Sequence, residues 1–250
     1  MAIISLHLPK TAGTSFGASL RTHFGDRYRS DYSDGGISRP QEERRATALS
    51  SGCVIAEHGL WNVDCVHGHF LPVKYLQLSA RCDLKFVTWM RDPVQRLLSH
   101  YYFWQKSYDE ATSSPHHRHV IEHGWTLEKF CMSEKFRNIY TQYLWEFPLE
   151  HFSFIGISER YEEDLRDFSK CFLSTDLEPL HLNETGYVSQ RDYADKAFLD
   201  RVRDFHAADV RLYQRALDLR QSRLRLQPSK QRKHDLIQTF MRLDDYQSVH

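Results

Sequence analysis

The sequence predicts an α/β fold in which a mostly parallel central sheet is flanked by helices. Short apolar segments rich in β-branched residues alternate with amphipathic segments of helical period along most of the chain, as in strands joined by helical crossovers. Two of the apolar segments, 2–8 and 84–90, run directly into polar loops that lead into helical patterns. With 250 residues, the chain is long enough to bury a substantial core.

Five strands are expected, each a short run of β-branched, aromatic or other apolar residues: 2–8, 53–57, 63–67, 84–90 and 152–157. The helical pattern falls at 14–24, 72–79, 93–106, 126–133, 135–145, 159–173, 195–220 and 229–242. We expect one domain over residues 1–220, followed by a charged C-terminal tail, 221–250, that contains a short helix. Two polar, turn-rich segments, 25–52 and 107–124, are interpreted as insertions in that domain.

Charge and hydropathy exclude several classes of partner. The 33 Lys and Arg residues balance 33 Asp and Glu residues, so the formal net charge is zero and no overall field attracts nucleic acid or an anionic membrane. The apolar run at 2–8 is too short to span a membrane, and no basic region precedes it as in a signal peptide. We therefore expect a cytoplasmic protein, as in bacteria, with no nucleic-acid partner. The sequence does not specify an oligomeric state.

The first anion-binding pattern follows the first predicted strand. It reads Pro9-Lys10-Thr11-Ala12-Gly13-Thr14-Ser15 and leads into a helical segment. In a strand–loop–helix of this kind, loop amides and the positive end of the helix dipole point at the anion. Lysine adds charge, and the hydroxyls add hydrogen bonds. The segment therefore predicts a site for a phosphate-like group.

A second pattern lies where the strand 84–90 meets the next helix. Pro93 suits the first position of a helix, and Asp92 is placed to cap it. Arg91 then leaves the carboxyl end of a strand, where open α/β sheets bind ligands. Ser99 lies two turns into the helix and can face the same crevice. An arginine fork with a hydroxyl suits a terminal phosphate, although this motif alone is also consistent with ordinary capping.

Together these segments resemble the sulfotransferases that use 3′-phosphoadenosine 5′-phosphosulfate (PAPS). The residues PKTAGTS are similar to the 5′-phosphosulfate loop of that family, and RDPVQRLLSHYYF to its 3′-phosphate segment. Between them, Val66-His67-Gly68-His69-Phe70 is similar to a motif of the uronosyl 2-O-sulfotransferases of glycosaminoglycan synthesis. The resemblance covers roughly residues 3–217. It implies a P-loop-like three-layer fold, PAPS as cofactor, and adenosine 3′,5′-bisphosphate as product.

The resemblance also implies residue roles. Lys10 would stabilise the leaving 5′-phosphate, and His69 would be the base with His67 as its partner. Two residues apart in a strand, these histidines share a side, but the sequence alone does not rank them. The 3′-phosphate ligands would be Arg91 and Ser99, with Asn183 in a loop over the adenine or 3′-phosphate. Further ligands of the 5′-phosphate would be Thr11, Gly13, Thr14, Ser15 and Phe16. No metal is required, because cations hold the leaving group.

The acceptor is less well specified. Similarity to the uronosyl enzymes implies a free hydroxyl on a saccharide or glycoconjugate, although residues 104–150 do not follow their acceptor-binding segments. Cationic side chains in the two polar segments are interpreted as solvated, with steering of an anionic acceptor as the alternative. They are Arg27, Arg29, Arg39, Arg44, Arg45, His116, His117, Arg118, His119 and His123.

Three other functions are consistent with the motifs. The first is a sulfotransferase that acts on a small-molecule or lipid hydroxyl. The second is a P-loop kinase, but there the lysine follows the glycines, whereas Lys10 precedes Gly13. The third is a non-catalytic nucleotide- or glycan-binding module, which would need neither Lys10 nor the histidine pair.

Overall fold

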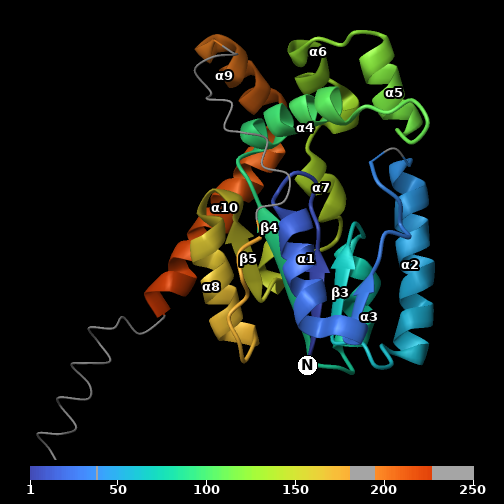
Figure 1. Ribbon diagram of the computed structural model, residues 1–250, viewed down its shortest axis with the longest axis vertical. Helices are drawn as coiled ribbons and strands as arrows, with labels where there is room; N and C mark the ends of the chain where they lie inside the picture. Colours follow the sequence, from blue (N-terminus) through green and yellow to red (C-terminus); the bar gives the residue numbers. More distant parts are fainter. Residues whose placement is uncertain (38, 181–194, 227–250) are drawn as a thin grey trace, which may run out of the picture. The chain divides into compact units, whose positions relative to one another are not determined.

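The computed structural model describes residues 1–37, 39–180 and 195–226 (Figure 1). Met1–Ala216 is one compact unit, and Leu217–His250 is a second. The first unit contains a five-stranded sheet in the order β2-β3-β1-β4-β5, and every strand pair in it is parallel. The strands are β1 (Ala2–Leu6), β2 (Tyr28–Ser30), β3 (Cys65–Gly68), β4 (Leu84–Met90) and β5 (Phe154–Ile157). The expected α/β class is confirmed.

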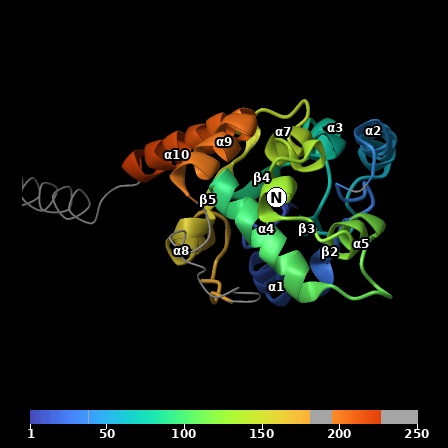
Figure 2. The same ribbon diagram turned by 90° about the horizontal axis from the view of Figure 1, so that it is seen from above.

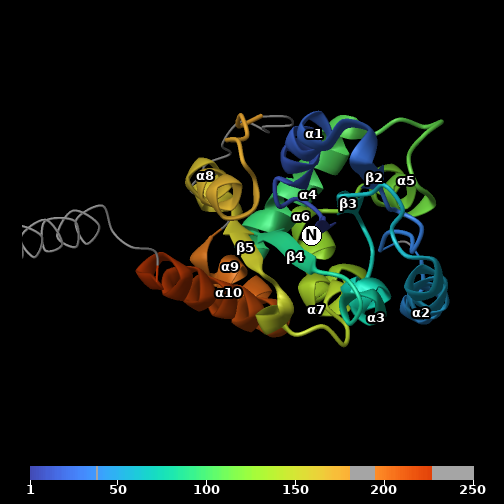
Figure 3. The same cartoon turned by 90° about the horizontal axis from the view of Figure 1, so that it is seen from below.

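Helices cover both faces of the sheet. The helices of the described residues are α1 (Gly13–Phe24), α2 (Gln41–His58), α3 (Leu76–Ser79), α4 (Pro93–Ser107), α5 (Pro115–Glu122), α6 (Leu127–Cys131), α7 (Ile139–Tyr143), α8 (Tyr161–Phe172), α9 (Lys196–Phe205) and α10 (Ala207–Leu226). Short 3₁₀ turns occur at Gly25–Arg27, Pro72–Tyr75, Glu134–Phe136, Leu149–His151 and Ser158–Arg160. Figures 2 and 3 show α1 and α8 on one face and α3 and α7 on the other, which makes three layers.

The core between the sheet and the α1–α8 layer explains why these strands form. Side chains that alternate along the strands point to this face, among them Val87 and Trp89 of β4. Phe16 of α1 packs edge-on against Trp89, with ring centroids 5.3 Å apart, and against Phe168 of α8 at 5.0 Å. Burial of large aromatic side chains supplies most of the stabilisation of such a layer.

A second apolar cluster joins α4, α5, α6 and α9, which lie beyond the carboxyl ends of the strands (Figure 1). Its centre is the stacked pair Phe130 and Phe136, with Leu97 of α4 and Val120 of α5 packed around it. These helices extend the molecule over the sheet edge at which both predicted anion motifs end.

One sequence-based strand assignment was wrong. Residues 53–57, predicted as a strand, lie in α2, because the helix-forming run before them continues through this short apolar stretch. Gly52 of α2 packs so closely on the carbonyl of Lys74 that a Cβ would lie 2.9 Å from it. The polar segment 25–52 contains β2 and most of α2, and the polar segment 107–124 contains α5.

Two further expectations concern the helix at 229–242 and the absence of a membrane span. The helix expected at 229–242 lies outside the described residues. Across the described ranges, no helix combines the length and apolar character needed to cross a membrane.

Candidate functional site

The two anion motifs meet at one point of the sheet. The loop that contains Lys10 follows β1, and Arg91 follows β4, the parallel neighbour of β1. From β1 the strand order runs to β3 and β2 on one side and to β4 and β5 on the other, and ligands of open α/β sheets bind at such a switch point. Burial and the nearby charge of Arg91 lower the pKa of Lys10 to about 8. Neither cation forms an ion pair with a described residue.

The loop after β1 has the backbone of an anion site. Lys10 and Ala12 adopt left-handed conformations, with φ of 65° and 64°, which are uncommon for residues other than glycine. Such turns direct successive N–H groups to one side. The helix α1 begins at Gly13 with no side-chain cap and no acidic residue in its first turn. An uncapped helix N-terminus favours a bound anion.

The other residues predicted for this loop have distinct environments. The hydroxyl of Thr11 is buried and donates to the carbonyl of Leu8 at 2.8 Å, so it closes the loop. Thr14 is exposed and Ser15 is buried. The side chain of Phe16 lies in the core, which leaves only its backbone for a ligand. These residues would therefore bind an anion mainly through their backbone.

The corner between β4 and α4, at Arg91, Asp92 and Pro93, has the capping that the sequence predicted. Asp92 caps α4 by accepting a hydrogen bond from the N–H of Gln95 at 2.9 Å, and Pro93 is the first helical residue. The buried Tyr140 fixes the corner, since its hydroxyl accepts from the N–H of Arg91 at 3.0 Å and donates to the Arg91 carbonyl at 2.6 Å. Ser99 is half-buried two turns further along the helix. Asn183 lies outside the described residues.

Three histidine rings stack beside the Lys10 loop. The ring of His7 lies between those of His67 and His69, with centroid distances of 5.1 and 4.2 Å. The predicted pair, His67 and His69, therefore lies in one stack, but the ring between them is that of His7, which the sequence analysis missed. A Cβ on Gly13 would overlap the His7 ring, and one on Gly17 would lie 2.5 Å from Nε2 of His67. Both glycines allow α1 to pack directly on the histidines.

The hydrogen bonds distinguish the two predicted histidines. Nδ1 of His69 donates to the carbonyl of His7, because a carbonyl oxygen can only accept. The neutral ring consequently carries its lone pair on Nε2, as a general base requires. Burial and the nearby Arg44 lower the pKa of His69 to about 4, despite the opposing His7 carbonyl, so this ring is neutral at pH 7.

His67 is more deeply enclosed. Its Nδ1 is hydrogen-bonded to the hydroxyl of Ser5 at 2.8 Å, and its buried Nε2 has no hydrogen-bond partner among the described residues. Burial, together with repulsion from His69, lowers the pKa of His67 to about 3. His67 thus supports the stack from the strand side and is less suited than His69 to exchange a proton with a ligand.

Two buried arginines near this edge were also missed. Arg96 of α4 is fully buried, and Nε, Nη1 and Nη2 all lack hydrogen-bond partners in the described ranges. Burial lowers the pKa of His100, and both Arg96 and Lys10 contribute to the shift. Arg44 of α2 is also buried, and its Nε and Nη2 have no hydrogen-bond partner there. The burial of Arg96 could have been predicted, because its position falls on the apolar face of the helix expected at 93–106.

Four cations near the carboxyl edge of the sheet, Lys10, Arg44, Arg91 and Arg96, therefore form no ion pair with another described residue. Nζ of Lys10 lies 3.8 Å from the centroid of the Phe103 ring, a contact that leaves its charge uncompensated. Buried cations without partners are costly, and a ligand with several negative charges would compensate them. The residues present thus fit the phosphates and sulfonate of PAPS, the cofactor that the sequence resemblance implies.

The histidines of the second polar segment are not all solvated. His117 of α5 is buried, stacks on Trp104 at 4.6 Å, and donates through Nε2 to the Trp104 carbonyl at 2.8 Å. Over the described part of the chain, no three His, Cys, Asp or Glu side chains are arranged to hold a metal ion. His117 therefore has a packing role rather than the steering role that was the alternative interpretation.

Comparisons with known proteins add little to this description. No protein-family model matches the chain, and neither does any curated protein. Among solved structures, the chain is similar to a sulfotransferase from Alicyclobacillus acidocaldarius, with 15% sequence identity and a TM-score of 0.42. The match covers 84% of this chain and 93% of that chain. At this identity and TM-score, the similarity does not establish a shared family or activity.

Proposed function

We propose that this chain is a PAPS-dependent O-sulfotransferase. The observation that carries the proposal is that Lys10 and Arg91, from separate motifs, meet at the switch point of the sheet and have no ion-pair partner among the described residues. Beside them, His69 presents a neutral ring whose Nδ1 is already engaged. An anion site with two cationic ends and an adjacent base is the arrangement that sulfuryl transfer from a bisphosphorylated nucleotide needs.

The binding residues divide between the two ends of the nucleotide. Lys10 and the backbone of Thr11, Gly13, Thr14, Ser15 and Phe16 would hold the 5′ end. Arg91 and Ser99 would hold the 3′-phosphate, with Asn183 as a further ligand. PAPS supplies the sulfuryl group when bound, and no metal is required in this proposal.

His69 and Lys10 perform the two halves of the chemistry. Nε2 of His69 takes the proton of the acceptor hydroxyl as that oxygen forms its bond to sulfur. Lys10 stabilises the negative charge that develops on the departing phosphate oxygen as the original S–O bond breaks. The products are the sulfated acceptor, adenosine 3′,5′-bisphosphate and a proton on His69. A bound polyanion raises the pKa of His69 from its low value in the free protein, which helps it accept that proton.

A saccharide or glycoconjugate is the proposed acceptor. The ring of Tyr32 is 50% exposed and lies near His69, with a centroid distance of 5.1 Å, and exposed aromatic faces of this kind bind sugars. This ring favours a sugar over a lipid or another small-molecule hydroxyl. The cytoplasmic location expected from the sequence is part of this proposal.

Calorimetric titration with adenosine 3′,5′-bisphosphate, ADP and ATP tests the proposal. We expect the 3′-phosphorylated ligand to bind at least about tenfold more tightly than ADP, and Arg91→Ala to remove this preference. Arg166→Ala, at an exposed position on α8, is the matched control and should bind like the wild type. Tighter, magnesium-dependent binding of ATP would instead support a kinase. Transfer of labelled sulfate to sugars, phenols and lipids then identifies the acceptor class.

A further inference from the structure

The backbone corner that presents Arg91 is held by a buried tyrosine. Met90 is the last residue of β4 that pairs with β5, and α4 begins at Pro93, so Arg91 lies past the sheet and before the helix. The hydroxyl of Tyr140 accepts from the N–H of Arg91 at 3.0 Å and donates to its carbonyl at 2.6 Å. Because side-chain rotamers depend on the backbone angles, fixing both groups limits where the guanidinium of Arg91 can lie.

Tyr140 is in turn anchored by a carboxylate from a helix that is distant in sequence. Asp209, in the first turn of α10, is fully buried. Its Oδ2 accepts from the N–H of Tyr140 at 3.0 Å, and its Oδ1 accepts from the N–H and the hydroxyl of Thr141 at 3.1 and 3.2 Å. The N-cap residue of α7, Asn138, makes no side-chain capping bond to that helix. Asp209 therefore takes the place of a cap for the first turn of α7.

Further hydrogen bonds fasten the start of α7 to the same region. The side-chain Oδ1 of Asn138 accepts from the N–H of Asp209 at 3.3 Å. The N–H of Asn138 donates to Nδ1 of His206 at 3.3 Å, and Nε2 of that histidine donates to the carbonyl of Cys131 at 2.8 Å. The position of Tyr140 on α7 is thus set by contacts with residues that lie close to Asp209 in the chain.

A buried cation lies near this anchor. Burial raises the pKa of Asp209, and the nearby charge of Arg96, with the hydrogen bonds from Tyr140 and Thr141, only partly offsets this effect. The guanidinium carbon of Arg96 lies 5.7 Å from the centroid of the Tyr140 ring. Any displacement of Asp209 would leave buried polar groups without partners, which is costly. The anchor consequently has one strongly preferred position.

We propose that Asp209, acting through Tyr140, is a positioning residue for Arg91, and that this link sets the preference of the site for a nucleotide with a 3′-phosphate. The inference rests on the proposed function, in which Arg91 binds that phosphate. Neither Tyr140 nor Asp209 binds the nucleotide in this proposal. Tyr140 fixes the corner, and Asp209 fixes Tyr140.

Adenosine 3′,5′-bisphosphate and AMP are the matched ligands for a test, because they differ only in the 3′-phosphate. Calorimetry measures both Kd values, with displacement titrations for the weaker ligand, and their ratio is the 3′-phosphate preference. Tyr140→Phe keeps the ring and removes both hydrogen bonds to Arg91. We expect it to lower the preference about tenfold and to change the Kd for AMP less than about twofold. A merely structural role would not move this ratio.

Two comparison variants accompany this change. Asp209→Asn should lower the preference by a similar factor, although the Tyr140 hydroxyl is still present. Tyr75→Phe is the matched control, since it removes a buried hydroxyl that donates to Asp31 instead of Arg91. This control should keep the wild-type ratio of the two Kd values.

A double-mutant cycle shows whether Asp209 acts through Tyr140. If it does, the combined variant Tyr140→Phe with Asp209→Asn should lose no more preference than Tyr140→Phe alone. Thr141→Ala removes only a hydroxyl donor to Asp209 at an exposed position, so it should fold where the other variants do not. We expect this milder change to lower the preference about two- to threefold.

Hydrogen exchange in the wild type tests the link without any substitution. Adenosine 3′,5′-bisphosphate should slow exchange at the N–H groups of Arg91, Tyr140 and Thr141 more than AMP does, because nucleotide binding and ordering of the corner are coupled in both directions. Equal protection by the two ligands would overturn the inference. A folded Tyr140→Phe or Thr141→Ala variant with the wild-type ratio, or strict additivity in the cycle, would overturn it as well. A wild type that binds adenosine 3′,5′-bisphosphate no more tightly than AMP would instead refute the proposed function itself.

Discussion

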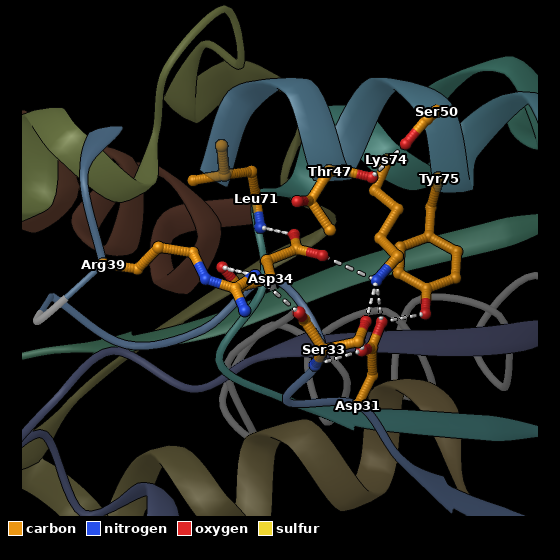
Figure 4. Close-up of polar contacts among 9 residues, drawn as sticks. All are labelled: Asp31, Ser33, Asp34, Arg39, Thr47, Ser50, Leu71, Lys74 and Tyr75. Carbon is orange, nitrogen blue, oxygen red and sulfur yellow. Dashed lines mark hydrogen bonds and ion pairs between the residues drawn. The ribbon is translucent and has the colours of Figure 1, made fainter. Parts of the chain in front are cut away.

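Removal of the Lys74 cation is the perturbation whose cost can be worked out most directly from the structure. The Lys74 side chain is 2% exposed, and its two carboxylate partners, Asp31 and Asp34, are 9% and 0% exposed. Lys74→Met keeps much of the apolar stem and deletes only the charge. Two carboxylates then share a buried site without a cation (Figure 4).

The expected cost is about 3–5 kcal/mol in the free energy of unfolding, because one partner of a buried ion pair is lost while the other charges stay buried. For a domain of this size, each kcal/mol lowers Tm by about 2–4 °C, which gives a fall of about 6–20 °C. Urea unfolding at pH 7 measures the free energy, and a thermal scan measures Tm. A loss below about 1 kcal/mol would show that the ion pairs of Lys74 with Asp31 and Asp34 are solvated and would refute this reasoning.

The pH dependence provides an independent check. Burial raises the pKa of Asp31, but hydrogen bonds from Lys74 and Tyr75 outweigh it and leave this pKa below its usual value. In the wild type, the stability from this group is present above the unfolded pKa and is lost as the pH falls through the lower folded pKa. Without the cation, burial dominates and the carboxyl pKa rises, so acid should neutralise the unpaired charge. The stability difference between Lys74→Met and wild type should therefore shrink between pH 7 and pH 4.

A double-mutant cycle assigns the cost to the pair. Asp34→Asn removes one of the two carboxylates, and the combined variant Asp34→Asn with Lys74→Met should cost less than the sum of the single changes. Strict additivity would mean that the two side chains do not interact, despite the distance of 2.7 Å between Nζ and Oδ1.

Further predictions concern the Lys10 loop and the histidine stack at the carboxyl edge of the sheet. Lys10→Ala should lower kcat about 100- to 1000-fold while changing the Kd for adenosine 3′,5′-bisphosphate less than about tenfold, and an unchanged kcat would contradict its role at the leaving group. Because the pKa of Lys10 is about 8 and a bound anion raises it, nucleotide binding near pH 8 should take up about half a proton. Calorimetry in buffers of different ionisation enthalpy measures this uptake, which Lys10→Ala should abolish. Gly17→Ala should destabilise the fold by about 1–3 kcal/mol despite its better helix propensity, since the Cβ would lie 2.5 Å from Nε2 of His67. Gly36→Ala, with nothing within 4 Å of its Cβ, is the control in urea unfolding. The pKa of His67 is lowered to about 3, so stability should fall as the pH drops below about 6.5, where the unfolded histidine gains a proton first.

The parts of the fold that could be predicted from sequence are those with local causes. The strand before Lys10 and the strand before Arg91 are short apolar runs that end at turn signals, and the structure confirms both. The cap at Asp92 and the first-turn proline at Pro93 were predictable because capping depends on residues within one helical turn. The meeting of the two motifs followed from parallel strands, whose carboxyl ends share one edge.

The missed features depend on contacts between distant segments. His7 looked like the end of an apolar strand, and only the pairing of β1 with β3 brings its ring between those of His67 and His69. Arg44 lies in a polar run typical of a solvated surface, so its burial against Tyr143 had no local signal. The strand predicted at 53–57 was wrong because a short apolar run has no period of its own, and packing on the chain at Lys74 favours the helix.

The arrangement of charges explains how a chain with no net charge can present a strongly cationic site. Equal numbers of acidic and basic residues would neutralise one another if they mixed freely at the sheet edge. Instead, Lys74 binds the buried carboxylates of Asp31 and Asp34, while Arg44, Lys10 and Arg91 form no ion pair with a described residue. Lys74 and its two carboxylates carry one net negative charge, so the three other cations leave an excess of two positive charges among these six residues. Because Coulomb interactions strengthen as water is excluded, this local excess outweighs the zero net charge of the chain for a ligand that enters the site.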